Sequence, residues 1–289
     1  MSEESIMLQL KAPAKINWFL SVLGKRHDGY HDISSLVQCI DLYDVLLFEH
    51  SDTLELISDI PDLPAEKNLV SRAARIMIEI AGGRRGVKIT LTKNIPLAAG
   101  LGGGSSDAAS TLVGLDRLWG MALGPERLRD IGASIGSDVP FFIVNTYALM
   151  EGRGERIHPL QEASEMTLLL VNPRIPVSTA WAYEACQNRL TKNLVDIKLL
   201  CQTLARKDFD ALNSLLVNDL EMAVIAAHPE IGRIKESLYR AGASASAMSG
   251  SGSTVFGVFR SAEEALTASG HMGGYWCRVV RTLTHPCQQ

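Results

Sequence analysis

The chain is predicted to be an α+β protein built from two units. Segments with a two-residue apolar period, typical of strands, occur among segments with helical spacing. The 289 residues suffice for one large or two ordinary domains. A polar stretch at residues 161–165 separates two series of such segments. We therefore expect one unit over residues 1–163 and a second over residues 164–289.

Composition points to an ordinary soluble globular protein. Hydrophobic residues make up 46% and charged residues 21%, and the net charge is -4. This charge gives no general attraction to nucleic acid or membranes. The acidic start and the lack of an apolar run near the roughly 18 residues of a membrane span predict neither a signal peptide nor an anchor. Five scattered cysteines and seven histidines without metal-ligand spacing predict a reduced, cytoplasmic protein without structural zinc.

The first elements follow from period and from breaking residues. Residues 7–23 are predicted as two strands joined by a tight turn at Pro13. Residues 44–58 alternate and are predicted as a hairpin. Residues 68–81 carry an apolar stripe at helical spacing, with Asn68 placed to cap the helix at its start.

A glycine-rich loop follows the alternating strand at residues 87–92 and precedes a helix predicted at residues 106–119. The loop reads Pro96-Leu97-Ala98-Ala99-Gly100-Leu101-Gly102-Gly103-Gly104-Ser105-Ser106. Its glycines let an anion approach the main chain, and Ser105 or Ser106 is expected to cap the helix. The order strand, glycine loop, helix favours a phosphate site over a flexible turn. It matches neither a Walker A loop nor a Rossmann fingerprint.

The remaining elements are predicted from period and turn signals. They are helices at residues 125–135, from Ser178 or Thr179, within 196–216, near Glu221, at 230–241 and at 261–270, and strands at 139–143, 147–150, 166–171, 255–259 and 275–283. Residues 243–254 are rich in Gly and Ser, which by composition alone is typical of a flexible linker.

The residues of several motifs resemble those of the GHMP kinases (galactose, homoserine, mevalonate and phosphomevalonate kinases). The sequence Pro-x-x-x-Gly-Leu-Gly-Gly-Gly-Ser-Ser-Asp-Ala-Ala at residues 96–109 is similar to their ATP loop. The additional glycines, Ala-Pro-Ala-Lys-Ile-Asn-x-Phe-Leu at 12–20 and Arg-x-Asp-Gly-Tyr-His at 26–31 resemble the branch that acts on 4-diphosphocytidyl-2-C-methyl-D-erythritol. The resemblance implies a mixed N-terminal ATP-binding domain, a ferredoxin-like C-terminal domain, and an active site in the cleft between them.

Lys15 and Asp138 are the catalytic residues that the resemblance implies. Taken alone, Lys15 reads as a lysine on a solvated strand face and Asp138 as a turn aspartate. The segment Gly-x-Asp-Val-Pro-Phe-Phe, however, is similar to the one that carries the catalytic aspartate of this branch. A carboxylate there would accept the proton of an attacking hydroxyl, and a neighbouring ammonium would favour its ionised form.

The resemblance also implies the binding residues. Tyr30, His31 and Tyr183 are implied to hold the cytosine, with Trp181 as a rival of Tyr183. Without the resemblance, Tyr30 and His31 would be assigned to a polar hairpin loop, and Tyr183 to the face of a helix. The substrate contacts implied elsewhere are Asn17, Ser249, Gly250 and Gly252. Asn68 is implied to lie near the adenine, beside the phosphate loop.

The activity implied is ATP-dependent phosphorylation of the 2-hydroxyl of 4-diphosphocytidyl-2-C-methyl-D-erythritol, with Mg²⁺. We identify no metal ligand, and Asp107 reads as a charge at a helix terminus. Two alternatives remain. A kinase for a sugar, homoserine or mevalonate would have no use for the cytosine-binding aromatic residues. A nucleotide-binding protein without activity would need neither Lys15 nor Asp138.

Overall fold

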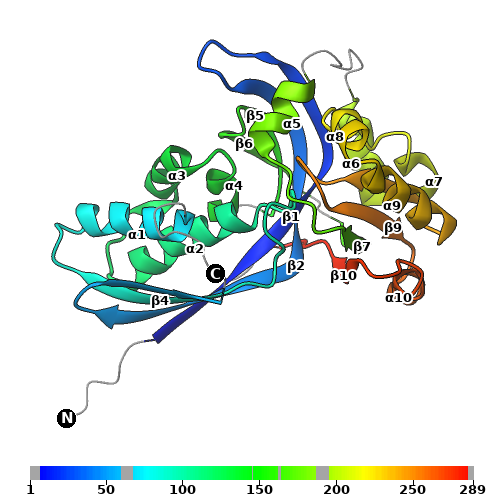
Figure 1. The fold of residues 1–289 in the computed structure, drawn as a ribbon. Coiled ribbons are helices and arrows are strands. Elements are labelled where there is room, and N and C mark those ends of the chain that lie inside the picture. The colour runs from blue at the N-terminus through cyan, green and yellow to red at the C-terminus, as the bar shows by residue number, and fades with distance from the viewer. Residues whose placement is uncertain (1–6, 60–67, 145, 162–163, 187–194, 286–289) are drawn as a thin grey trace.

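The computed structural model describes residues 7–59, 68–144, 146–161, 164–186 and 195–285. Its strands form two sheets, which confirms the α+β class (Figure 1). The first sheet contains β1 (Met7–Lys25), β2 (His31–Ser51), β3 (Leu54–Ser58), β4 (Gly86–Thr92), β5 (Tyr147–Gly152) and β6 (Arg156–Pro159). The second contains β7 (Thr167–Asn172), β8 (Ala245–Met248), β9 (Val255–Phe259) and β10 (Trp276–Arg281).

Helices cover both sheets. In the first half they are α1 (Leu69–Ile80), α2 (Gly103–Leu118), α3 (Gly124–Ile135) and α4 (Val139–Val144). In the second half they are α5 (Thr179–Cys186), α6 (Ile197–Arg206), α7 (Phe209–Leu212), α8 (Glu221–Ala227), α9 (Pro229–Arg240) and α10 (Ala262–Ser269). None of the described helices combines the length and the apolar character that crossing a membrane requires.

The predicted turn at Pro13 is wrong, because β1 is one continuous strand. It pairs antiparallel with β2 from Met7, opposite Glu49, to Lys25, opposite His31. The register shifts between Pro13 and Ala14, where proline has no N–H to donate to the ladder. The irregularity lies opposite Pro13 on β2, where Asp41 and Leu42 have no partner in β1, and β1 itself continues.

The predicted hairpin at residues 44–58 is also wrong. The strand β4 lies between β2 and β3, antiparallel to the first and parallel to the second. Gly86 permits this arrangement, since a Cβ there would collide with the backbone of Asp52 and Thr53. An alternating pattern indicates a strand but does not identify its neighbour in the sheet.

One strand prediction and one helix start need correction. Residues 139–143 were predicted as a strand but belong to helix α4. A short apolar run with Pro140 in its first turn fits a buried helix as well as a strand. The helix α2 begins at Gly103, with Gly102 as its N-cap at a φ of 72°. Ser105 and Ser106 therefore lie inside its first turn and do not cap it. Helix α1, by contrast, is capped by Asn68 as predicted, since Asn68 accepts a hydrogen bond from the Val70 N–H at 2.9 Å.

One apolar core joins the two halves of the chain. Ile16 and Trp18 of β1 lie in the same buried cluster as Phe256 of β9, and the Trp18 and Phe256 rings meet edge to face at 5.8 Å. The Gly/Ser-rich stretch at residues 243–254 contains β8, whose four residues are all buried, so it is not the flexible linker that its composition alone would indicate. The division at residues 163 and 164 stays a prediction, and residue 163 lies outside the described residues.

Candidate active site

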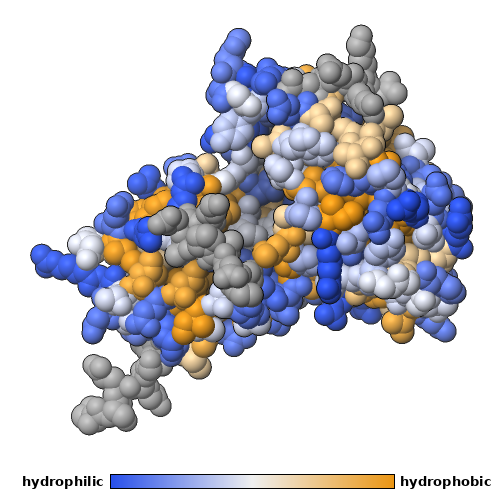
Figure 2. Space-filling view, viewed as in Figure 1, coloured by the Kyte–Doolittle hydropathy of each residue, from blue (hydrophilic) through white to orange (hydrophobic). Residues whose placement is uncertain are grey.

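A cavity of about 980 Å³ is lined by residues from both halves of the chain. Its wall contains most of the predicted site residues, namely Lys15, Asn17, Tyr30, His31, Pro96, Leu97, Ala98, Ala99, Gly100, Leu101, Gly102, Gly103, Gly104, Ser105, Asp138, Tyr183 and Gly250. At one end the strands β1 and β2 project outward as a hairpin, whose surface is hydrophilic (Figure 2). The glycine-rich loop and the start of α2 form the other end.

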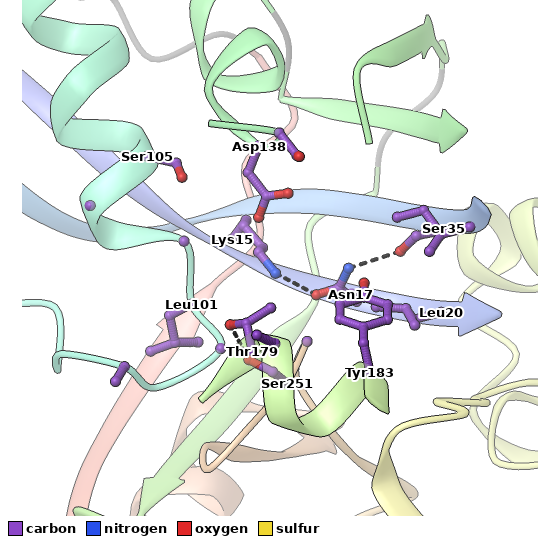
Figure 3. Close-up of a pocket in the computed structure, with 18 of the residues that line it drawn as sticks. Lys15, Asn17, Leu20, Ser35, Leu101, Ser105, Asp138, Thr179, Tyr183 and Ser251 are labelled. Atoms are coloured by element: carbon purple, nitrogen blue, oxygen red, sulfur yellow. Dashed lines mark hydrogen bonds between the residues drawn. The ribbon is translucent and has the colours of Figure 1, made fainter. Parts of the chain in front are cut away.

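Lys15 is a buried cation with a fixed position. Its Nζ donates to Asn17 Oδ1 at 2.6 Å, and Asn17 Nδ2 donates to Ser35 Oγ at 2.8 Å (Figure 3). Ser35 in turn donates to the Phe19 carbonyl at 2.7 Å. The Lys15 backbone N–H bonds the Leu101 carbonyl at 2.9 Å, so the same residue is attached to the glycine loop. This chain of hydrogen bonds fixes the ammonium at the floor of the cavity.

Asp138 faces this ammonium from the other wall. It is half-buried, directly precedes α4, and directs its carboxylate toward Lys15 (Figure 3). Burial lowers the pKa of Lys15, which is only 5% exposed, and the Asp138 charge opposes that effect. The pair thus places a proton acceptor and a cation next to the same part of the cavity.

The two glycine-rich segments contact each other directly. Ser249 Oγ donates to the Gly100 carbonyl at 3.0 Å, and the Thr254 N–H bonds the Ala99 carbonyl at 3.2 Å. Gly100 has a φ of 75°, and a Cβ there would collide with the Ser249 carbonyl. At Gly102 a Cβ would lie 2.8 Å from the Phe142 ring. A side chain at either glycine would therefore collide with the protein, so the backbone of the loop packs closely on its neighbours.

Four predicted residues lie behind the wall. Ser106 is buried inside α2, Asn68 caps α1, and Ser249 bonds Gly100. Gly252 packs on Met248, where a Cβ would meet the sulfur at 2.6 Å. Of the described residues, those that line the cavity do not include these four.

A buried ion cluster that the sequence did not reveal lies under the glycine loop. Lys93 forms ion pairs with Asp44 and with Asp107, the latter at 2.6 Å, and Lys93 itself lines the cavity. Asp107 is therefore not a charge at an exposed helix terminus. Burial raises the pKa of Asp107 to about 7, the Lys93 ammonium opposes this rise, and the Asp44 carboxylate adds to it. The alternation of residues 87–92 gave no sign that the next lysine is buried.

Aromatic residues line the opposite end. The rings of His31 and Tyr183 stack, with centroids 5.4 Å apart and planes at 20°. Tyr30 is 49% exposed, and the Arg153 guanidinium lies 5.0 Å from its ring centroid. Burial lowers the pKa of His31, and the nearby Lys25 charge adds to this effect. This end therefore presents flat, partly exposed ring faces together with a cation.

The structure separates the two candidates on α5. Tyr183 lines the cavity, whereas Trp181 points its ring at His228, with centroids 6.0 Å apart. Burial raises the pKa of Tyr183, and the Asp138 charge adds to the rise. Thr179, one turn earlier, bonds Ser251 at 3.0 Å across the cavity wall. Ser251 lies within residues 249–253, which were expected to contact phosphate, whereas sequence reasoning missed Thr179 and Arg153, whose residue types are common in caps and turns.

Known proteins are similar to this chain over almost its whole length. Residues 68–146 match the family "GHMP kinases N terminal domain", and residues 197–272 match "GHMP kinases C terminal". The 4-diphosphocytidyl-2-C-methyl-D-erythritol kinase of Thermodesulfovibrio yellowstonii is 48% identical, covering 97% of this chain and 99% of that protein. The protein of the same name from Geobacter metallireducens is 46% identical, covering 91% and 92%.

Solved structures share the fold. A crystal structure of 4-(cytidine 5'-diphospho)-2C-methyl-D-erythritol kinase superposes with a TM-score of 0.84 at 32% identity, covering 95% of this chain and 99% of that one. A homoserine kinase from Cytophaga hutchinsonii superposes with a TM-score of 0.73 at 20% identity, covering 99% and 97%. The second likeness concerns the fold alone.

Proposed function

This chain belongs to the 4-diphosphocytidyl-2-C-methyl-D-erythritol kinase family of the GHMP kinases, and on that premise we propose which atoms its site acts on. The chain is an ATP-dependent small-molecule kinase. Its proposed reaction transfers the γ-phosphoryl group of ATP to the 2-hydroxyl of 4-diphosphocytidyl-2-C-methyl-D-erythritol, giving ADP and the 2-phosphate. The observation that carries this proposal is one cavity with a main-chain end, a Lys15–Asp138 centre and an aromatic end.

The glycine end suits the phosphates of ATP. Residues 100–102 lead into α2, a helix of 16 residues. The first amides of a helix and its positive dipole end favour an anion, and glycines let the phosphates approach the backbone. The loop lines the cavity of about 980 Å³, which has room for a triphosphate.

The centre suits in-line phosphoryl transfer. The 2-hydroxyl oxygen forms a bond to the γ-phosphorus while the bond from that phosphorus to the β,γ-bridging oxygen breaks, and ADP leaves. Asp138 accepts the hydroxyl proton. Lys15, held by Asn17, orients the hydroxyl and offsets the negative charge of the transferring group.

The aromatic end suits the cytosine. Stacking of a base on an aromatic ring contributes about 1–3 kcal/mol, and Tyr30, His31 and Tyr183 offer ring faces there. His31 also supplies hydrogen-bonding nitrogens for a pyrimidine edge. A base bound there would place the methylerythritol part toward Lys15 and Asp138.

Mg²⁺ would neutralise the phosphate charge of bound ATP. The side chains fit this ion, because Mg²⁺ is commonly held by one or two carboxylates together with substrate phosphates. Asp138 supplies a carboxylate and Ser105 a hydroxyl in the cavity wall. Within the described residues, no three His, Cys, Asp or Glu side chains are grouped to hold a metal.

We also propose that the enzyme acts in the cytoplasm, with no nucleic acid or membrane as a partner.

The test measures ADP release with Mg-ATP and each of four acceptors, namely the cytidylated substrate, mevalonate, homoserine and galactose. We expect turnover of the cytidylated substrate alone. In Asp138→Asn we expect kcat to fall by about 10²–10⁴-fold, because the proton acceptor is lost while the shape is kept. Turnover of another acceptor would overturn the cytosine assignment. ATP binding without turnover of any acceptor would favour a nucleotide-binding protein.

A further inference from the structure

Residues 217–221, which sequence analysis left without a role, make contact with both halves of the site. The Leu20 N–H bonds the Val217 carbonyl at 2.8 Å, and the Asp219 N–H bonds the Leu20 carbonyl at 2.9 Å. Asp219 Oδ2 also accepts from the Val22 N–H at 2.8 Å. The segment therefore lies beside β1 as a short parallel bridge, five residues from Lys15.

The Asn218 side chain extends from this bridge to the second glycine segment. Its Nδ2 donates to the carbonyls of Met248 and Gly250, each at 2.8 Å, and its Oδ1 accepts from the Leu220 N–H at 3.0 Å. Two carbonyls can only accept and an N–H can only donate, so the amide has one consistent orientation. Glu221 adds a bond from Met248 N–H to its Oε2 at 2.8 Å and pairs its other oxygen with Lys235.

Gly250 connects these bonds to the catalytic centre. A Cβ on Gly250 would lie 3.0 Å from Lys15 Nζ and 2.9 Å from the Gly100 carbonyl, so its backbone touches both the cation and the first glycine loop. Moving Gly250 by a few tenths of an ångström would change the space around Lys15. Asn218, in contrast, is not among the described residues that line the cavity.

We propose that residues 217–221 form a positioning element, with Asn218 as its central residue, that holds the second glycine segment in register with β1 and thereby fixes Gly250 against Lys15. Asn218 acts through Gly250 and has no contact with substrate. The proposal rests on the kinase function described above. It implies that loss of the two donated bonds impairs the phosphoryl-transfer step more than acceptor binding, because Tyr30, His31 and Tyr183 lie at the other end.

The test compares Asn218→Asp with Asn218→Ser. The aspartate has the same shape but sets a second oxygen against two carbonyl oxygens, whereas the serine retains one donor. We expect kcat to fall by about 10- to 100-fold in Asn218→Asp and only a few-fold in Asn218→Ser. A small displacement of the reacting groups is enough to lower the rate of phosphoryl transfer strongly. The KM for the acceptor is expected to change less than about threefold in both. Asn213→Asp is the matched control, since the Asn213 side chain accepts from the Tyr239 hydroxyl and an aspartate retains that acceptor.

Thermal unfolding measured beside kcat separates positioning from folding. A kcat per folded molecule that stays at the wild-type value in both Asn218 variants overturns the proposal, as does a loss that appears only in KM. If Asn218→Asp does not fold, the few-fold kcat loss expected in Asn218→Ser decides. Wild-type turnover tests the proposed function separately, and the variants are measured with whichever acceptor the wild type phosphorylates.

Discussion

The two ends of the cavity are built in opposite ways. At the glycine end a side-chain atom on Gly100 or Gly250 would meet backbone oxygen, and main-chain groups form the wall. At the aromatic end, no described atom lies within 4 Å of a Cβ placed on Gly29, and the exposed ring of Tyr30 follows it. Closely packed backbone forms much of the glycine end, beside Lys93 and Ser105, whereas side chains form the aromatic end.

This difference indicates what each end contributes. A wall of packed backbone has one arrangement, so it suits a ligand part that does not vary, such as a phosphate chain. A wall of exposed side chains is altered by single substitutions, so it suits the recognition of one acceptor. Changes at the glycine end should therefore affect stability and both substrates, whereas changes at the aromatic end should affect the acceptor alone.

The largest effect is expected from Gly100→Ala. The new Cβ collides with the Ser249 carbonyl and occupies a φ of 75°, which disfavours side chains. We expect kcat/KM for ATP to fall by about 100-fold or more, and the free energy of unfolding to fall by about 1–3 kcal/mol. Steady-state kinetics and urea unfolding measure these quantities.

Gly29→Ala is its matched control, because Gly29 has a φ of 86° but open space around it. It carries a comparable backbone strain without the collision, so its kcat/KM for ATP should stay within about threefold of wild type. Equal losses in the two variants would mean that backbone strain, and not the closeness of the two glycine segments, limits activity.

A smaller and more selective effect is expected from Tyr183→Ala. Loss of base stacking, worth about 1–3 kcal/mol, should raise the acceptor KM by about 5- to 150-fold. The KM for ATP should stay within about twofold of the wild-type value, because the glycine end is untouched. Trp181→Ala, two residues away on α5, contacts His228 and should leave both KM values unchanged. A similar rise in KM for both substrates in Tyr183→Ala would contradict the separation of the two ends.

The smallest effect on activity is expected from Asp107→Asn, which instead changes the pH dependence of stability. The pKa of Asp107 in the folded protein is raised to about 7, so folding favours its protonated form. Stability from this group is present below its ordinary pKa and is lost as pH rises from about 4 to about 7. The asparagine cannot ionise, so the free energy of unfolding of the variant, relative to wild type, should increase over this range by about 1 kcal/mol or more.

Urea unfolding at pH 5, 6, 7 and 8 measures this difference. Asp116→Asn, further along α2, controls for the loss of a carboxylate from the same helix. A constant difference between Asp107→Asn and wild type at all four pH values would show that Asp107 is ionised throughout.

Local patterns predicted much of this structure. The strands β4, β7 and β9, helix α1 with its Asn68 cap, and the glycine loop before α2 all follow from period and capping residues within about fifteen residues. The motifs also brought together Lys15, Asp138 and Tyr183, which are far apart in sequence, because their resemblance to a family carries information about a known fold. All three line the same cavity.

Contacts between distant residues escaped prediction. Lys93 and Asp44 are 49 residues apart, and Val22 bonds Asp219 across 197 residues. Neither pair has a local pattern, because an isolated lysine or aspartate looks the same whether it is exposed or buried in an ion pair. The continuity of β1 through Pro13 was not predicted for a related reason. A register shift of this kind depends on the partner strand β2, which is distant in the sequence.

The last described strand region has a consequence for synthesis on the ribosome. Thr282 forms a bridge to Ile40 of β2, and the Arg281 N–H bonds Asp41 across 240 residues. At about 5–20 residues per second, translation takes roughly 10–50 s to supply this partner after β2 has emerged. During that interval Ile40 of β2, which is paired with Ala14 of β1, awaits this second partner. The nascent chain therefore leaves this stretch of β2 without that neighbour until residue 282 has been added.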